Sequence, residues 1–214
     1  GGVIIDAGKF DWTNGKFPEF TEPSPGYHGL VYSEVLEAAS FIAKVRIEGL
    51  RDYGSSLSPF NAFQIIQGLE TLELRIKKHS ENALALAKWL QKQDIVSWVN
   101  YPGLETSPYK KLSEEYLPKG QSGLVTFGVK GGYEIAKNVV DQTKLFSLLA
   151  NIGDTKSLII HPASTTHQQL STDSQILTGV SKDLIRLSVG LEDIDDLKAD
   201  LEQAFKFIKS GVEK

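Results

Sequence analysis

The sequence predicts a mixed α/β domain, and three observations support this prediction. After residue 94 of the 214-residue chain, short apolar segments of strand length alternate with longer segments of helical period. A long helical pattern precedes them, over residues 56–93. Hydrophobic residues make up 41% of the chain and charged residues 23%, as in ordinary globular domains. A small sheet with helices on one face fits this pattern, in an α/β or α+β arrangement.

The C-terminal part, residues 94–214, carries five predicted strands. They are Val96–Tyr101, Leu124–Val129, Leu145–Leu149, Ser157–Ile160 and Leu184–Val189. Helices are predicted at Pro108–Tyr116, Tyr133–Gln142 and Asp193–Lys209. The last of these has an apolar stripe at helical spacing, acidic residues at its start and lysines at its end, which suits the helix dipole.

Residues 56–93 are predicted to form a spine helix between two subdomains. Ser58 and Pro59 are typical of a helix start, and no further proline occurs before Pro102. Gly68 is expected to bend the helix. We place the domain boundary within this segment.

The first 55 residues begin with a predicted strand, Val3–Asp6. Residues 8–29 follow as a long excursion with five aromatic side chains: Phe10, Trp12, Phe17, Phe20 and Tyr27. Because aromatic side chains favour burial, this excursion is predicted to be ordered rather than a linker. A helix is expected at Glu34–Leu50. The chain has no methionine and opens in mid-strand, so we expect it to be a piece of a longer protein.

The composition narrows the classes of function. A net charge of −4 gives no electrostatic reason to expect nucleic acid or an anionic membrane as partner. No apolar run approaches the length of a membrane span. The absence of cysteine removes disulfides, thiolate catalysis and thiolate metal sites. We therefore expect no nucleic-acid partner and no membrane partner.

Arg186 is the main candidate for a binding residue. It is the only arginine after residue 75, and it lies in a strand whose apolar residues Ile185 and Leu187 alternate onto the other face. Ser188 shares its face. A polar turn that starts at Asn151 offers an amide and backbone N–H groups, and a guanidinium fork suits a carboxylate. Arg186 and Asn151 are therefore predicted to bind a small carboxylate, although a solvent-facing Arg186 is the more common case for an isolated strand arginine.

Other polar motifs favour structural roles. His161 and His167 are six residues apart without a Glu or Cys pattern, so no metal site is expected, and His161 is interpreted as a strand-end residue held by hydrogen bonds. Residues 164–166 are expected to be a solvated loop. The glycines at 128–132 favour a tight βα turn over a phosphate loop. Residues 27–29 (Tyr-His-Gly) favour a turn over an acid or base.

Several longer motifs resemble the cysteine/methionine-metabolism family of pyridoxal-phosphate (PLP) enzymes over essentially the whole chain. They are RDYGSSLSPFNAFQIIQGLETLELRIKKHSENALALAKWL, NYPGL, TFGVKGGYE, LANIGDTKSLIIHPASTTHQQLS and LIRLSVGLEDIDDLKADL. The excursion GKFDWTNGKFPEFTEPSPGYHG and the segment ANIGDTKSL are similar to the sulfhydrylase branch of the family.

The resemblance implies the transferase fold type I. Residues 1–55 would be the end of the large PLP-binding domain, 56–93 the spine helix and 94–214 the smaller C-terminal domain. Arg186 and Asn151 match positions at the substrate carboxylate. The family's Schiff-base lysine stands in a Ser-x-Thr-Lys context that this sequence lacks, so the lysine and the other PLP-binding residues are expected upstream, and the isolated chain is predicted to be inactive.

The resemblance also implies a reaction. It is a γ-replacement that converts O-acetylhomoserine and sulfide to homocysteine and acetate, with O-acetylserine, which gives cysteine, as a second substrate. A cytoplasmic homo-oligomer, a dimer of dimers, is implied for the full-length protein. Two alternatives stay open. One is a non-catalytic fragment with a folding or assembly role, and the other is a related γ-lyase or cystathionine γ-synthase.

Overall fold

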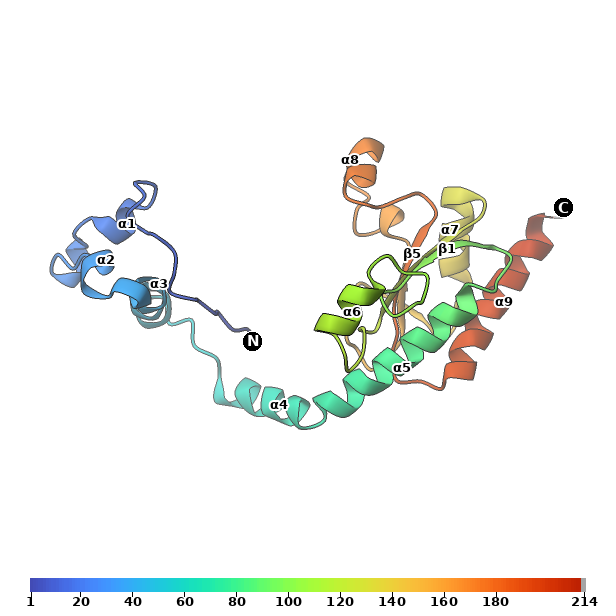
Figure 1. Ribbon diagram of the computed structural model, residues 1–214, viewed down its shortest axis with the longest axis horizontal. Coiled ribbons are helices and arrows are strands. Elements are labelled where there is room, and N and C mark those ends of the chain that lie inside the picture. The colour runs from blue at the N-terminus through green and yellow to red at the C-terminus, as the bar shows by residue number, and fades with distance from the viewer. Residues whose placement is uncertain (213–214) are drawn as a thin grey trace. The chain divides into compact units, whose positions relative to one another are not determined.

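The chain forms two compact units in a computed structural model, which describes residues 1–212 (Figure 1). The first unit is Gly1–Glu70, and the second begins at Thr71. The division falls inside the predicted spine segment, residues 56–93. The assignment of residues 1–55 to a cofactor domain stays a prediction.

The first unit consists of short helical turns around an aromatic cluster. Its helices are α1 (Pro18–Thr21), α2 (Tyr32–Val35), α3 (Ser40–Lys44), a π-helical segment (Val45–Asp52) and α4 (Pro59–Glu70), with 3₁₀ turns at Pro25–Tyr27 and Glu37–Ala39. The Trp12 ring stacks on Phe20 at 4.1 Å between centroids and on Phe41 at 5.6 Å. Phe10 and Phe17 pack against the same indole. The excursion at 8–29 is therefore ordered by its aromatic side chains, as its composition predicts.

Two predictions for this unit are wrong. Val3–Asp6 forms no strand, and the side chains of Val3 and Ile5 are exposed. A strand needs a partner for its backbone N–H and C=O groups, and within the described residues this unit offers only one isolated bridge, at Ser24 and Leu30. The predicted helix Glu34–Leu50 is interrupted, because Glu37 has a positive φ of 41° that no α-helix accommodates.

The predicted spine, for which the sequence allows one helix or a pair of helices, consists of the two helices α4 and α5. Ser58 Oγ accepts a bond from Asn61 N at 3.2 Å and so caps α4, as predicted. The helical path breaks at Thr71, whose φ and ψ are −110° and 6°, and not at Gly68. Helix α5 (Leu72–Leu90) then leads into the sheet of the second unit.

The second unit contains a five-stranded sheet. Its strands are β1 (Val96–Asn100), β2 (Leu124–Val129), β3 (Ser147–Leu148), β4 (Leu158–Ile160) and β5 (Leu184–Ser188). Their order is β1-β2-β5-β4-β3, and only the β3–β4 pair is parallel. The other helices are α6 (Lys110–Tyr116), α7 (Gly132–Gln142), α8 (Thr172–Leu177) and α9 (Ile194–Val212). Every predicted strand and helix after residue 94 is present within a few residues, and α8 with the 3₁₀ turn Pro162–Ser164 was not predicted.

Helices α5, α7 and α9 cover one face of the sheet and enclose the core (Figure 1). Ile185 and Leu187 of β5 are fully buried in this core beside Phe127 of β2 and Leu201 of α9. Because side chains alternate along a strand, the intervening residues of β5 point to the opposite face. The mixed α/β fold is confirmed, and it places Arg186 on the face away from the three helices.

Candidate functional site

Arg186 lies in the middle of the sheet. Strand β5 runs between β2 and β4, and the residues directly opposite Arg186 are Thr126 and Ile160. The side chain of Arg186 is half-buried. A strand at the edge of a sheet has a neighbouring strand on one side only. The backbone of Arg186 is fixed by a strand on each side.

The turn after β3 meets Arg186, as the sequence predicts. Arg186 Nη2 donates to the carbonyl oxygen of Asn151 at 3.4 Å, and Gly153 N donates to Ser188 Oγ at 3.3 Å. The sequence predicts the side-chain amide of Asn151 as a donor to the anion, and it does not predict this contact between Arg186 and the main-chain carbonyl of Asn151. Asn151 Oδ1 accepts from Ile152 N at 2.9 Å, which leaves Nδ2 without a protein partner among the described residues.

No carboxylate in the described part of the chain forms an ion pair with Arg186. Within the described residues, none of the ion pairs found at 4 Å or less involves Arg186. The guanidinium is partly exposed, so a ligand in solution can reach it. The Arg186 guanidinium and the Nδ2 amide of Asn151 are therefore donors available to an anionic ligand.

The far end of the turn is fixed by a network that sequence reasoning missed. The hydroxyl of buried Ser157 accepts from Gly190 N at 2.7 Å and donates to Glu192 Oε2 at 2.8 Å. Ser157 N donates to the other carboxylate oxygen, Oε1, at 2.8 Å. In the sequence Glu192 is noticed only as part of the acidic start of a helix, because its partner Ser157 lies 35 residues away.

Helix α5 holds the same segment from the other side. Asn82 Nδ2 donates to Gly190 O at 3.0 Å and to Glu192 O at 2.9 Å. The ring nitrogen Nδ1 of His79 lies 2.6 Å from Val189 O. Both side chains are buried. Residues 189–192 are thus bonded to α5 on one side and to the turn on the other.

The remaining motifs have the structural roles predicted for them, with one correction. His161 is held by Ser164 Oγ and by Lys182 O, each at 2.9 Å from a ring nitrogen, and its ring packs on Tyr133. Gly131 has a φ of 102° and starts α7, so the glycine segment is a tight βα turn. Residues 27–29 form a turn. Residues 164–166 are only partly solvated, because Pro162–Ser164 is a 3₁₀ turn and Thr165 Oγ1 bonds to His161 O.

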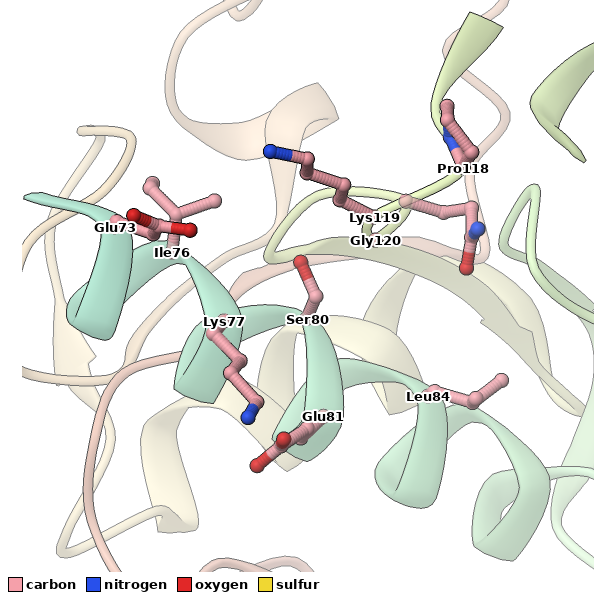
Figure 2. A pocket seen from close by; sticks show the side chains of 10 residues that line it. Glu73, Ile76, Lys77, Ser80, Glu81, Leu84, Pro118, Lys119 and Gly120 are labelled. Atoms are coloured by element: carbon pink, nitrogen blue, oxygen red, sulfur yellow. The ribbon is translucent and has the colours of Figure 1, made fainter. Parts of the chain in front are cut away.

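A separate cavity of about 630 Å³ lies between α5 and residues 118–121 (Figure 2). In Figure 2 the hydroxyl of Ser80 points from α5 toward Lys119 and Gly120. Neither Arg186 nor Asn151 lines it. Its rim carries both signs of charge, from Lys77 and Lys119 and from two glutamates, so it favours no single class of ligand.

The donors around Arg186 fit a carboxylate and not the aldehyde of a PLP cofactor. A guanidinium stays protonated at all relevant pH values and forms no Schiff base. Among the described residues no cluster of three or more metal-ligating side chains is found. No helix among these residues is long and apolar enough to cross a membrane.

Fold and site together define a mixed α/β domain with an arginine on an inner strand of its sheet. The family model described as "Cys/Met metabolism PLP-dependent enzyme" matches residues 1–206. The chain therefore belongs to the Cys/Met-metabolism family of PLP-dependent enzymes.

Individual relatives agree with this assignment. The chain is 55% identical to an O-acetyl-L-homoserine sulfhydrylase of Leptospira meyeri, over 97% of this chain and 49% of that protein. It is 53% identical to O-acetyl-L-homoserine sulfhydrylase 1 of Thermus thermophilus, over 95% of this chain and 48% of that protein. A homocysteine synthase of Schizosaccharomyces pombe is 50% identical, over 96% and 48%. The chain spans about half the length of the curated relatives it matches.

A solved structure supports the fold. A Campylobacter jejuni protein assigned as an O-acetylhomoserine (thiol)-lyase superposes with a TM-score of 0.78 at 48% identity, over 88% of this chain and 45% of that one. That crystal structure carries a pyridoxyl-lysine phosphate group. The predicted family, the type I fold class and the PLP dependence of the family are confirmed.

Proposed function

We propose that this chain is part of an O-acetylhomoserine sulfhydrylase and supplies the site for the substrate α-carboxylate. The net reaction breaks the bond between Cγ and the acetyl oxygen of O-acetylhomoserine and forms a bond between Cγ and sulfur. Hydrosulfide enters, acetate leaves, and homocysteine is the product. The names of relatives at 50–55% identity support this reaction class.

The observation that carries the proposal is that Arg186 lies beside Asn151 and forms no ion pair with a carboxylate of the described residues. An α-carboxylate has two oxygens, and the guanidinium fork can donate to both. The Nδ2 amide of Asn151 is a third donor. A hydrogen bond to a charged group contributes about 1.5–3 kcal/mol, enough to select an amino acid over a neutral analogue. We infer that Arg186 binds and orients the substrate, while the PLP cofactor is held by residues that precede this chain in the full-length protein.

The first experiment is an assay of the holoenzyme that contains this chain, with sulfide and O-acetylhomoserine. Homocysteine and acetate are expected in equal amounts. Absence of homocysteine would reject the proposed function. The same assay separates the related chemistries, because a γ-lyase releases a keto acid and a cystathionine γ-synthase needs cysteine as the sulfur donor.

The second experiment tests Arg186 itself. Arg186→Ala should raise the KM for O-acetylhomoserine by roughly ten- to a hundredfold, the cost of one charged hydrogen bond, and should leave the cofactor absorbance unchanged. Lys206→Ala is the control, since it removes a positive charge from the surface of α9, where Lys206 pairs with Glu202. If the two variants have equal KM values, Arg186 does not belong to the site.

O-Acetylserine is a second candidate substrate. A Saccharomyces cerevisiae relative at 46% identity is named homocysteine/cysteine synthase. The two substrates differ by one methylene, and a pocket distinguishes such a change by only about 1–3 kcal/mol. Competition between the two acetylated amino acids in one assay gives the ratio of their kcat/KM values.

We also expect the full-length protein to be a cytoplasmic dimer of dimers and the isolated 214 residues to form no homocysteine. Exposed apolar side chains along α4 support an assembly, because an apolar helix surface favours burial against another protein surface. Native mass measurement of the holoenzyme tests the oligomer. The isolated chain is tested with added PLP, and homocysteine formation would overturn that expectation.

A further inference from the structure

We propose that Asn82, Ser157 and Glu192 are positioning residues for the carboxylate site. They touch neither Arg186 nor Asn151 in the structure, but they hold the segment that carries Asn151. The proposal rests on the function proposed above, in which Arg186 and Asn151 meet the α-carboxylate of the substrate.

The contacts at the two ends of this segment differ in length. At the site end, the contacts from Arg186 to Asn151 and from Gly153 to Ser188 measure 3.4 and 3.3 Å, and residues 151–153 are exposed. At the other end, the three bonds that join Ser157 to Gly190 and Glu192 measure 2.7, 2.8 and 2.8 Å, and Ser157 is fully buried. Short bonds to a carboxylate are the strong ones. The order of the segment therefore comes from its Ser157 end.

The carboxylate of Glu192 can serve as an anchor because its own backbone is fixed. Asn82 uses both N–H groups of its side-chain amide, one for Gly190 O and one for Glu192 O. Asn82 belongs to α5, which packs in the core of the unit. Hence α5, the end of β5 and the segment 151–157 form one connected set of hydrogen bonds.

This connection has a consequence for binding. The segment leaves Ser157 and reaches Arg186 within six residues, so a shift at Ser157 moves Asn151 relative to the guanidinium. A misplacement of about 1 Å can cost roughly a hundredfold in an enzyme rate. Loosening the network should therefore weaken recognition of the amino acid, although no residue that touches the substrate has changed.

The test is Ser157→Ala in the holoenzyme. This substitution leaves Gly190 N without an acceptor and Glu192 Oε2 without a donor. The KM for O-acetylhomoserine should rise roughly tenfold, and the KM for sulfide should stay unchanged, because sulfide has no carboxylate. Ser113→Ala is a matched control, since Ser113 is also buried and its hydroxyl donates to Pro102 O at 3.0 Å and to Lys110 O at 2.8 Å. A loss of stability alone would affect both variants equally.

Glu192→Gln is a second variant of nearly the same shape, and hydrogen exchange is a second measurement. Amides of residues 151–157 should exchange faster in Ser157→Ala and Glu192→Gln than in Ser113→Ala. Faster exchange together with an unchanged KM for the amino acid would overturn the positioning role, as would unchanged exchange. A wild-type enzyme that makes no homocysteine would instead refute the proposed function, while the exchange rates would still test the network.

Discussion

Gly190 lies where β5 leaves the sheet, and the backbone of the turn 153–157 occupies the space beside its Cα. A Cβ at this position would lie 2.6 Å from the carbonyl carbon of Lys156. The hydrogen bonds from Gly190 N to Ser157 Oγ and from Leu191 N to Thr155 O hold the two segments at this separation. Backbone atoms cannot move aside as a flexible side chain can, so only glycine fits.

Gly190→Ala should therefore destabilise the protein by about 1–3 kcal/mol, the usual cost of overpacking. Gly26→Ala is the comparison, because no atom lies within 4 Å of a Cβ built at Gly26. Its effect should stay within about 0.5 kcal/mol. Urea unfolding of both variants measures the difference, and equal midpoints would show that the segment shifts without cost.

Asp200 of α9 binds three consecutive amides of the turn between α7 and β3. Its carboxylate accepts from Lys144 N, Leu145 N and Phe146 N at 2.8, 2.9 and 3.0 Å, and the side chain is buried. Asp200→Ala should cost about 3 kcal/mol, because it removes three hydrogen bonds to a charged group and leaves the buried amide of Phe146 without its acceptor. Glu202→Ala on the same helix removes only an exposed ion pair and should cost less than about 1 kcal/mol. Denaturant midpoints that coincide for the two variants would contradict this account.

At the scale of elements, Asp183 ties the edge strand β1 to β5. Its Oδ2 accepts from Trp98 Nε1 at 2.9 Å and from Ser97 Oγ at 3.3 Å. Burial by itself raises the pKa of Asp183, but hydrogen bonds to its carboxylate, among them those from Trp98 and Ser97, outweigh it and lower that pKa below its usual value. The ionised form is thus favoured in the folded state.

Because the pKa of Asp183 is lowered, the stability that these hydrogen bonds contribute depends on pH. Its contribution to stability is fully present above the unfolded-state pKa of Asp, near about pH 4, and is lost as the pH falls through the lower folded-state value. Asp183→Asn should therefore show a smaller loss of stability below about pH 4 than the wild type. Thermal unfolding at a series of pH values measures this, and parallel profiles for the two proteins would contradict it.

The elements of the second unit could be predicted because their signals are local. Apolar alternation in β5 and the Gly131-Gly132 start of α7 need no distant partner to be recognised. The apolar run Val3–Asp6 has the same local signal of a strand, yet it pairs with no strand in the described residues. The breaks at Glu37 and Thr71 depend on single backbone angles that composition does not reveal.

In the candidate site, too, local features could be predicted from the sequence, whereas contacts between distant residues could not. The proximity of Arg186 and Asn151 followed from a strand and a polar turn, but the use of the Asn151 carbonyl did not. The network of Asn82, Ser157 and Glu192 joins residues 35 and 110 positions apart, and the sequence pattern says nothing about such distances. Hydrogen bonds between distant segments are visible only once the sheet order is known.

On the scale of the whole molecule, the second unit contains a complete hydrophobic core. Every residue of the main buried cluster lies after Thr71, from Ala83 on α5 to Ile208 on α9. Residues that share one core usually fold together. The first unit contributes no residue to that cluster.

Residues 71–214 alone should therefore fold and unfold in a single cooperative transition. Trp89, which stacks on Phe205, and Trp98, which bonds to Asp183, report on packing at two places in the unit. Far-ultraviolet circular dichroism and tryptophan fluorescence should give the same urea midpoint. Two different midpoints, or a gradual change without a transition, would show that the unit needs the first 70 residues.

The sheet order has a consequence for the synthesis of the protein. Strand β5 is the last to leave the ribosome, yet it occupies the centre of the sheet between β2 and β4. Until residue 188 has been made, the antiparallel pair β1–β2 and the parallel pair β3–β4 have no strand between them to join them into one sheet. Sheet contacts of such long sequence separation form slowly, and unpaired strand edges aggregate readily. Between the synthesis of residues 160 and 188, the nascent chain therefore carries two open sheet edges at which wrong strand pairing can begin.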